Sequence, residues 1–209
     1  EIPNMLLSGP PGIGKTTVAK ALCNELGADY YVINGSDEGR FLDTVRTNAK
    51  NFASTVSLTS ESKHKVIIID EADNTTSDVQ LLLRASIEEF SRNCRFIFTC
   101  NYKNKIIEPL HSRCSVIDFA VDKRSKPGIA AQFFSRINYI LEQEKVESDK
   151  KVIVELISKH FPDWRRVLNE LQRYSIGGII DSGILASFSD VAVDDLLKSL
   201  KQKNFSDVR

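Results

Sequence analysis

The chain has 209 residues, of which 42% are hydrophobic and 27% charged, a globular composition long enough for one medium domain and one smaller domain. Its 28 lysine and arginine residues balance 28 aspartate and glutamate residues, which excludes a strongly basic nucleic-acid-binding domain. Any contact with nucleic acid must therefore come from a local patch or from helix N-termini. No apolar run approaches the roughly 20 residues that cross a bilayer, and the chain enters a glycine-rich loop without a secretory signal, so we expect a cytoplasmic protein with no membrane partner.

Five short apolar runs alternate with helical patterns in the first part of the chain. These runs are residues 4–8, 30–34, 66–70, 95–101 and 115–119. The third, VIIID, is continuously aliphatic, as expected of a parallel strand that is covered on both faces. The alternation predicts an α/β fold, with a five-stranded parallel sheet flanked by helices and joined by right-handed crossovers.

After the fifth run the pattern changes to helices alone. The charged segment VDKRSKP at 121–127 is typical of a hinge, and apolar residues then recur at helical spacing. We therefore predict a core at 1–121 and a small all-helical domain at 122–188. A short amphipathic stretch at 189–209 is interpreted as the possible start of a further domain.

The four cysteines form no Cys-x-x-Cys pair. They are Cys23, Cys94, Cys100 and Cys114. A structural zinc site usually needs such a pair, so we interpret them as reduced and mostly buried thiols.

Residues 9–16 read GPPGIGKT and match the phosphate-loop motif G-x-x-x-x-G-K-[ST], between an apolar run and a helical pattern. Glycines let backbone N–H groups converge on phosphate oxygens without a Cβ in the way, and the helix that follows adds its positive end. Lys15 can bridge the β- and γ-phosphates, and Thr16 can place its hydroxyl on Mg²⁺. The motif therefore predicts ATP and Mg²⁺ as ligands. The nucleotide-binding residues are predicted to be Gly9, Pro10, Pro11, Gly12, Ile13, Gly14, Lys15, Thr16 and Thr17.

The second motif, VIIIDEAD at 66–73, brings acids to the end of a strand, where ligands bind in such sheets. Asp70 is predicted to bind nucleotide by holding Mg²⁺ through water, and Glu71 to polarise the attacking water. A solvated residue at a strand end is the alternative for each. For Asp73 a turn or cap role is favoured. The tetrad also spells the DEAD-box helicase signature, which we discount because the rest of the chain forms helices rather than a second RecA-like domain.

Residues 75–119 resemble the core of a sliding-clamp-loader ATPase subunit of the replication factor C type, a family of AAA+ ATPases. Residues 34–54 are similar to the stretch after the second strand of that family, and residues 161–185 resemble the large subunit of T-even-type bacteriophages. The resemblance covers almost the whole chain, and the Ser-Arg-Cys triplet at 112–114 is diagnostic within AAA+ proteins. It implies a P-loop NTPase (AAA+) fold with a helical lid domain. The implied activity is Mg²⁺-dependent ATP hydrolysis that opens a sliding clamp and places it on primer–template DNA during replication.

The resemblance also assigns catalytic roles. Asn101 matches the sensor-1 residue that orients the catalytic water, with a capping asparagine as the alternative. Arg113 matches the arginine finger that reaches the ATP of the adjacent subunit, a task that suits the guanidinium fork, with a surface arginine as the alternative. Arg165 matches sensor 2, which contacts the γ-phosphate of its own subunit. Its neighbour Arg166 is not excluded by helical spacing.

Gln80 and Arg84 lie four residues apart, on one face of the helix that follows the acidic motif. In the family this helix faces the DNA duplex and couples it to the acidic motif, so both are DNA-coupling candidates. Two alternatives remain open. Ser77-x-x-Gln80 can form a capping box, and Arg84 can pair with Glu88.

Two family features are missing, namely the segment that wraps the adenine and most of the C-terminal collar that builds a ring-like or spiral oligomer. We therefore expect a fragment that is monomeric by itself. The expected partners of the full-length protein are other clamp-loader subunits, the sliding clamp and primer–template DNA, in the cytoplasm of a host cell if the source is a phage. Two rivals remain: a non-hydrolysing scaffold subunit, which tends to lose the phosphate-loop lysine or the acidic pair, and another AAA+ DNA motor of the branch-migration helicase type.

Overall fold

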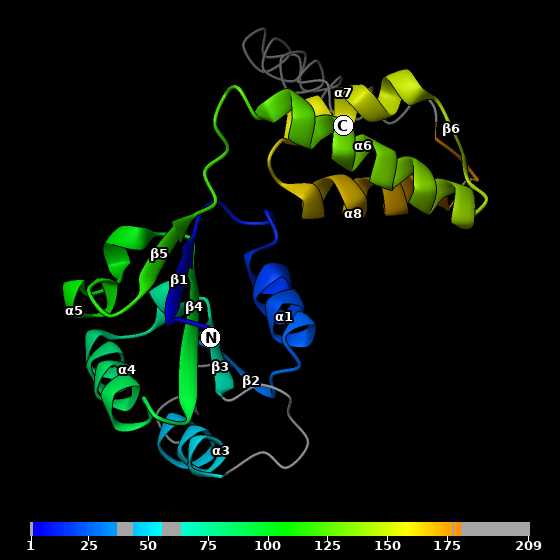
Figure 1. The fold of residues 1–209 in the computed structure, drawn as a ribbon. Coiled ribbons are helices and arrows are strands. Elements are labelled where there is room, and N and C mark those ends of the chain that lie inside the picture. The colour runs from blue at the N-terminus through cyan, green and yellow to red at the C-terminus, as the bar shows by residue number, and fades with distance from the viewer. Residues whose placement is uncertain (1, 37–43, 56–63, 177, 181–209) are drawn as a thin grey trace, which may run out of the picture. The chain divides into compact units, whose positions relative to one another are not determined.

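The computed structural model of the chain divides into two compact units, Glu1–Asp122 and a second unit that begins at Lys123 (Figure 1). The residues that it describes are 2–36, 44–55, 64–176 and 178–180. Each unit has its own hydrophobic core. The predicted start of a further domain at 189–209 lies outside the described residues.

The first unit holds a five-stranded sheet in which every neighbouring pair is parallel, in the order β2-β3-β4-β1-β5. The strands are β1 (Met5–Ser8), β2 (Tyr30–Asn34), β3 (Lys65–Asp70), β4 (Cys94–Cys100) and β5 (Ser115–Asp118). Each boundary lies within one residue of the predicted run, so the predicted α/β fold with a parallel five-stranded sheet is confirmed.

Helices cover both faces of this sheet, with α1 on one side and α4 on the other (Figure 1). The helical segments of the unit are α1 (Lys15–Glu25), η1 (Thr44–Ala49), α3 (Lys50–Ser54), η2 (Ala72–Asn74), α4 (Ser77–Glu89), η3 (Lys103–Lys105) and α5 (Glu108–His111). Ile67 of β3 shares a core with Leu83 of α4, whereas its neighbour Ile68 shares a core with Ala19 of α1. Burial on both faces explains why this strand is aliphatic at successive positions.

The second unit is a small helical domain. Its helices are α6 (Lys126–Gln143), α7 (Lys150–His160) and α8 (Trp164–Ser175). Ile137, Ile153 and Val167, one from each helix, are buried together at its centre. The unit also contains a short parallel pair that the sequence did not predict, β6 (Glu147–Ser148) with β7 (Ile179–Ile180).

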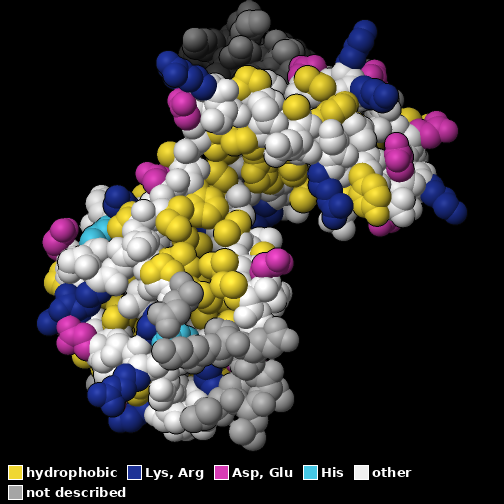
Figure 2. Space-filling model, in the orientation of Figure 1, with side chains coloured by type: hydrophobic (Ala, Val, Ile, Leu, Met, Phe, Trp, Pro, Cys, Tyr) yellow, Lys and Arg dark blue, Asp and Glu magenta, His cyan; other side chains and the backbone are white. Residues whose placement is uncertain are grey.

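Charged side chains of both signs are interspersed over the visible face of each unit (Figure 2), in line with the formal net charge of zero. In the part of the chain that the structure describes, no helix combines the length and apolar character needed to span a bilayer.

Candidate functional site

Three loops meet at the carboxyl-terminal edge of the sheet because β1, β3 and β4 are parallel neighbours. The glycine-rich loop at 9–14 follows β1, the acidic motif ends β3, and Asn101 follows β4. This edge is where ligands bind in open α/β sheets.

The loop at 9–14 depends on glycine for its backbone path. Gly12 and Gly14 have φ angles of 74° and 101°, a region that side chains with a Cβ rarely adopt. Gly9 lies so close to Phe119 that an added Cβ would be 2.8 Å from the Cβ of that residue. Gly14 is also the N-cap of α1, and no side chain caps this helix end. The first turn of α1 therefore keeps N–H groups available for an anion.

Lys15 lies buried between this loop and the end of β4. Its Nζ donates hydrogen bonds to the carbonyl oxygens of Gly9 (2.8 Å) and Pro10 (2.9 Å), and to Oδ1 of Asn101 (2.8 Å). The lysine and the predicted sensor-1 residue, 86 positions apart in the chain, are thus in direct contact. A bound phosphate would compete for the same ammonium group.

Thr16 and Asp70, both predicted to act on Mg²⁺, are brought together. Thr16 Oγ1 donates to Oδ1 of Asp70 at 2.6 Å, and Thr99 Oγ1 donates to the same oxygen at 2.5 Å. A hydroxyl and a carboxylate are the hard oxygen donors that Mg²⁺ prefers, usually completed by waters and substrate phosphates. Among the described residues no group of three or more His, Cys, Asp or Glu could hold a metal ion. The donor set therefore fits Mg²⁺ bound together with a nucleotide.

Glu71 is held in a tight turn beside Asp70. Its φ of 54° and ψ of 45° are left-handed, and its N–H donates to Oγ1 of Thr99 at 3.0 Å. The carboxylate accepts hydrogen bonds from the hydroxyl of Ser36 and, at 3.1 Å, from Nδ2 of Asn74. At Gly35 an added Cβ would lie 2.5 Å from the carbonyl oxygen of Glu71, so only glycine lets the end of β2 approach this turn. Both the backbone and the carboxylate of Glu71 are therefore oriented.

Asp73, for which the sequence favoured a turn or cap role, instead joins two of these loops. Its side chain is buried, and Oδ2 accepts hydrogen bonds from the N–H groups of Asn101 (3.1 Å) and Tyr102 (3.0 Å). The bonds run from the acidic motif to the segment that carries the predicted sensor. The sequence analysis did not predict this role of Asp73 and did not single out Thr99, for which the available signal was a hydroxyl inside an otherwise apolar strand.

Gln80 is buried, with only 1% of its surface exposed. Its Nε2 donates to the carbonyl oxygens of Lys105 (3.1 Å) and Thr75 (3.3 Å), and its Oε1 accepts from the N–H of Ile107 (2.8 Å). The capping-box alternative is wrong, because the N-cap of α4 is Thr76 and no side chain caps it. Gln80 links α4 to the backbone beyond β4, so it does not present its side chain to solvent.

We expect Gln80→Leu to lower the free energy of unfolding by about 1–3 kcal/mol, because it leaves buried backbone groups without hydrogen-bond partners. Urea denaturation checks this, with the exposed Gln132→Leu on α6 as the control that stays within about 0.5 kcal/mol. Equal stability of the two variants would show that the Gln80 hydrogen bonds are replaced by water.

Arg84 and Arg113 both contact Glu88 near the end of α4. Arg84 Nη2 lies 3.9 Å from Oε1 of Glu88, which confirms the alternative ion pair. Arg113 donates to the same oxygen from Nε (2.9 Å) and Nη2 (2.6 Å), and this interaction holds the pKa of Glu88 below its ordinary value. Arg113 precedes β5, whose first residue pairs with the first residue of β1. It therefore lies at the amino-terminal edge of the sheet, opposite the glycine-rich loop.

Arg165 and Arg166 are exposed in the first turn of α8, whose N-cap Asp163 accepts a hydrogen bond from the N–H of Arg166 at 3.0 Å. Both belong to the second unit, so the choice of Arg165 as sensor 2 stays a prediction.

The cysteine thiols are not suited to chemistry at neutral pH. Burial raises the pKa of Cys23 to about 11 and that of Cys94 to about 12. Burial also raises the pKa of Cys100 to about 11 and that of Cys114 to about 12. A protonated thiol is a weak nucleophile and a poor metal ligand.

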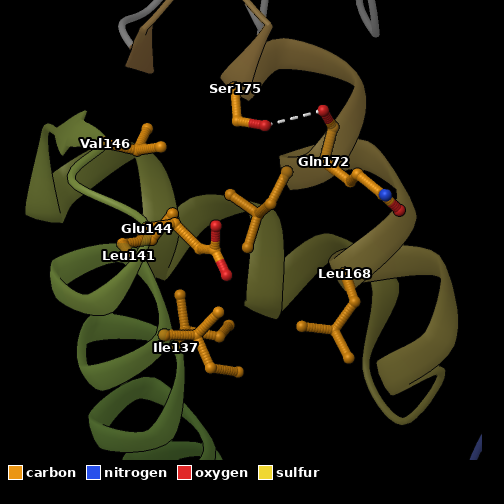
Figure 3. Close-up of a pocket in the computed structure, with 9 residues that line it drawn as sticks. Ile137, Leu141, Glu144, Val146, Leu168, Gln172 and Ser175 are labelled. Carbon is orange, nitrogen blue, oxygen red and sulfur yellow. Dashed lines mark hydrogen bonds between the residues drawn. The ribbon is translucent and has the colours of Figure 1, made fainter.

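A cavity of about 500 Å³ in the second unit lies between α6 and α8 (Figure 3). Its lining includes Ile137, Leu141 and Leu168, and the carboxylate of Glu144 points into it. None of the residues predicted to bind nucleotide lines this cavity, so it is separate from the candidate site.

Two family models and several curated proteins match this chain by sequence. Residues 5–121 match the family described as "ATPase family associated with various cellular activities (AAA)", and residues 126–186 match "Sliding-clamp-loader large subunit, AAA+ ATPase lid domain". The sliding-clamp-loader large subunits of Escherichia phage RB69 and Enterobacteria phage T4 are each 41% identical over 100% of the chain. The replication factor C small subunit of Methanocella arvoryzae is 39% identical over the same share. The chain spans 66% of the length of each of these three relatives.

Among solved structures, the Thermotoga maritima RuvB Holliday junction branch migration motor is similar with a TM-score of 0.64 and 21% sequence identity. The match covers 91% of this chain and 62% of that one. An identity this low shows a common fold and nothing about activity.

Proposed function

Since this chain belongs to the family of AAA ATPases, we propose that it hydrolyses ATP as a subunit of a DNA sliding-clamp loader. Its substrates would be ATP and water, and its task would be to open a sliding clamp and place it on primer–template DNA. Support comes from the lid match over residues 126–186 and from the phage and archaeal relatives. The partners in this proposal are other loader subunits, the clamp and the DNA. The proposed location is the cytoplasm, which is that of a host cell if the source is a phage.

The residues at the carboxyl-terminal edge of the sheet would act on the ATP of their own subunit. Lys15 would neutralise the β- and γ-phosphates, and Thr16 and Asp70 would hold Mg²⁺. Bound Mg²⁺ supplies charge neutralisation on the β- and γ-oxygens. Glu71, already oriented by Ser36 and Asn74, would polarise the attacking water. Asn101 would orient that water, and Arg165 of the lid would contact the γ-phosphate.

The proposal that each ATP site is shared between two adjacent subunits rests on the position of Arg113. β5 pairs with β1 along its whole length of four residues. Because a strand rises about 3.3 Å per residue, the start of β5 and the end of β1 lie at opposite edges of the sheet. Arg113 precedes this strand, whereas the glycine-rich loop follows β1. An arginine at the far edge is poorly placed for its own nucleotide but can reach the nucleotide of an adjacent subunit.

We expect the full-length protein, assembled with its partner subunits, to turn over ATP faster when both the clamp and primer–template DNA are added than with either alone. Steady-state phosphate release measures this. An assembly with Lys15→Ala serves as the control, because it should stay inactive under all conditions. No joint stimulation would contradict the loader assignment. Stimulation by four-way junction DNA instead would favour a branch-migration motor, and absence of all turnover would favour the scaffold subunit.

A further inference from the structure

All three nitrogens of the Arg113 guanidinium group donate hydrogen bonds within their own unit. Nε and Nη2 donate to Oε1 of Glu88, as described above, and Nη1 donates to the carbonyl oxygen of Pro109 at 3.0 Å and to Oγ of Ser112 at 3.4 Å. Each of the three nitrogens therefore has an acceptor on the same chain. A phosphate on another subunit could engage the fork of Arg113 fully only by displacing one of these acceptors.

Glu88 is the only anion among these three acceptors, so it is the one that an anionic phosphate can replace like for like. Its side chain is 56% exposed and that of Arg113 is 28% exposed, so the pair lies at the surface, where ion pairs are weak. The pair borders an open groove of about 700 Å³. Its other lining residues include Asn4, Arg95 and Ser112. The open side of the groove leaves the guanidinium accessible to a second molecule.

Arg84 provides a second cation for Glu88. It lies one helical turn before Glu88 on α4, with Nη2 at 3.9 Å from the oxygen that Arg113 occupies. When Arg113 leaves, Glu88 keeps a positively charged neighbour instead of being left unpaired. The nearby Arg84 therefore lowers the electrostatic cost of replacing the Glu88 carboxylate by a phosphate as the anion bound to Arg113.

We propose that Glu88 is a positioning residue that keeps Arg113 folded against its own subunit until the triphosphate bound to a neighbouring subunit replaces the carboxylate. The inference rests on the proposed function, in which Arg113 acts on the adjacent ATP. It assigns to Glu88 a competing role: the carboxylate opposes ATP-dependent subunit contact and does not take part in hydrolysis.

The test uses Glu88→Gln in the full-length assembly, since glutamine has the same shape without the charge. We expect the KM for ATP to fall about two- to five-fold, the range of an exposed ion pair. The dissociation constant for the contact between subunits, measured in the presence of a slowly hydrolysed ATP analogue, should fall by the same factor. The kcat should stay within about two-fold of wild type, because no interaction of the transition state is removed. The matched control is Glu89→Gln, the same charge change one residue further on, where the carboxylate pairs with Lys50 at 3.5 Å. It should leave both constants unchanged.

A double-mutant cycle separates this role from a structural one. If Glu88 acts through Arg113, Glu88→Gln should have no effect on subunit association when Arg113 is already alanine. An equal effect in both backgrounds would overturn the inference, as would a lower kcat with unchanged KM, which would mean that Glu88 aids hydrolysis. No change at all in Glu88→Gln would overturn it too. If Arg113→Ala itself changes neither association nor turnover, the proposed function fails, whatever the behaviour of Glu88.

Discussion

Replacing Arg113 by alanine is expected to lower ATP turnover of the full-length assembly by about 10³- to 10⁵-fold, the usual contribution of an arginine finger. ATP binding should weaken far less, by about the two- to five-fold expected of an exposed ion pair, because Lys15, Thr16 and Asp70 of the subunit that binds the nucleotide are unchanged. Phosphate release measures turnover, and titration with a fluorescent ATP analogue measures binding. The matched control is Arg92→Ala, an exposed arginine just after α4, which should behave as wild type.

A mixing experiment tests whether Arg113 acts across a subunit boundary. Lys15→Ala subunits keep Arg113 but cannot use their own phosphate loop, and Arg113→Ala subunits have the reverse defect. Neither variant should be active alone, but a mixture forms junctions in which an intact Arg113 meets an intact phosphate loop. Recovered turnover in the mixture supports the shared site. Failure to recover any activity, with assembly intact, would place the whole site within one subunit.

The parts of the site that were predicted from the sequence are those that depend on local pattern. The five strands follow from short apolar runs, and GPPGIGKT specifies a loop whose glycines are needed for backbone geometry, as the φ angles of Gly12 and Gly14 show. The acids of β3 follow from their place at the end of an aliphatic strand. In each case the residues that make up the signal are neighbours in the chain.

The contacts that join the loops to one another were not predictable in this way. Asp73 reaches the N–H of Asn101 across 28 positions, and Gln80 reaches the N–H of Ile107 across 27. Helical spacing placed Gln80 on a polar face, but tertiary hydrogen bonds allowed it to be buried. The pairing of Arg113 with Glu88 is likewise set by how α4 packs against α5, the short helix just before Arg113, which no periodicity encodes.

The second large effect is expected for Glu71→Gln, which should lower turnover by about 10²- to 10⁴-fold, the usual contribution of a general base. The amide oxygen of glutamine can still accept hydrogen bonds from Ser36 and Asn74, so the turn should keep its shape, but it cannot take a proton from water. ATP binding and its Mg²⁺ dependence should survive, because Thr16 and Asp70 remain joined.

Phosphate release and ATP titration in the full-length assembly measure the two quantities, and Glu25→Gln, exposed at the end of α1, is the control for loss of one negative charge. The combination of retained binding with lost turnover is informative, because it separates a base from a residue that merely supports the nucleotide. If both fell together, Glu71 would be maintaining the loop, and if neither fell, another group would activate the water. Only loss of turnover alone agrees with a carboxylate that is oriented by Ser36 and Asn74 beside Thr16 and Asp70.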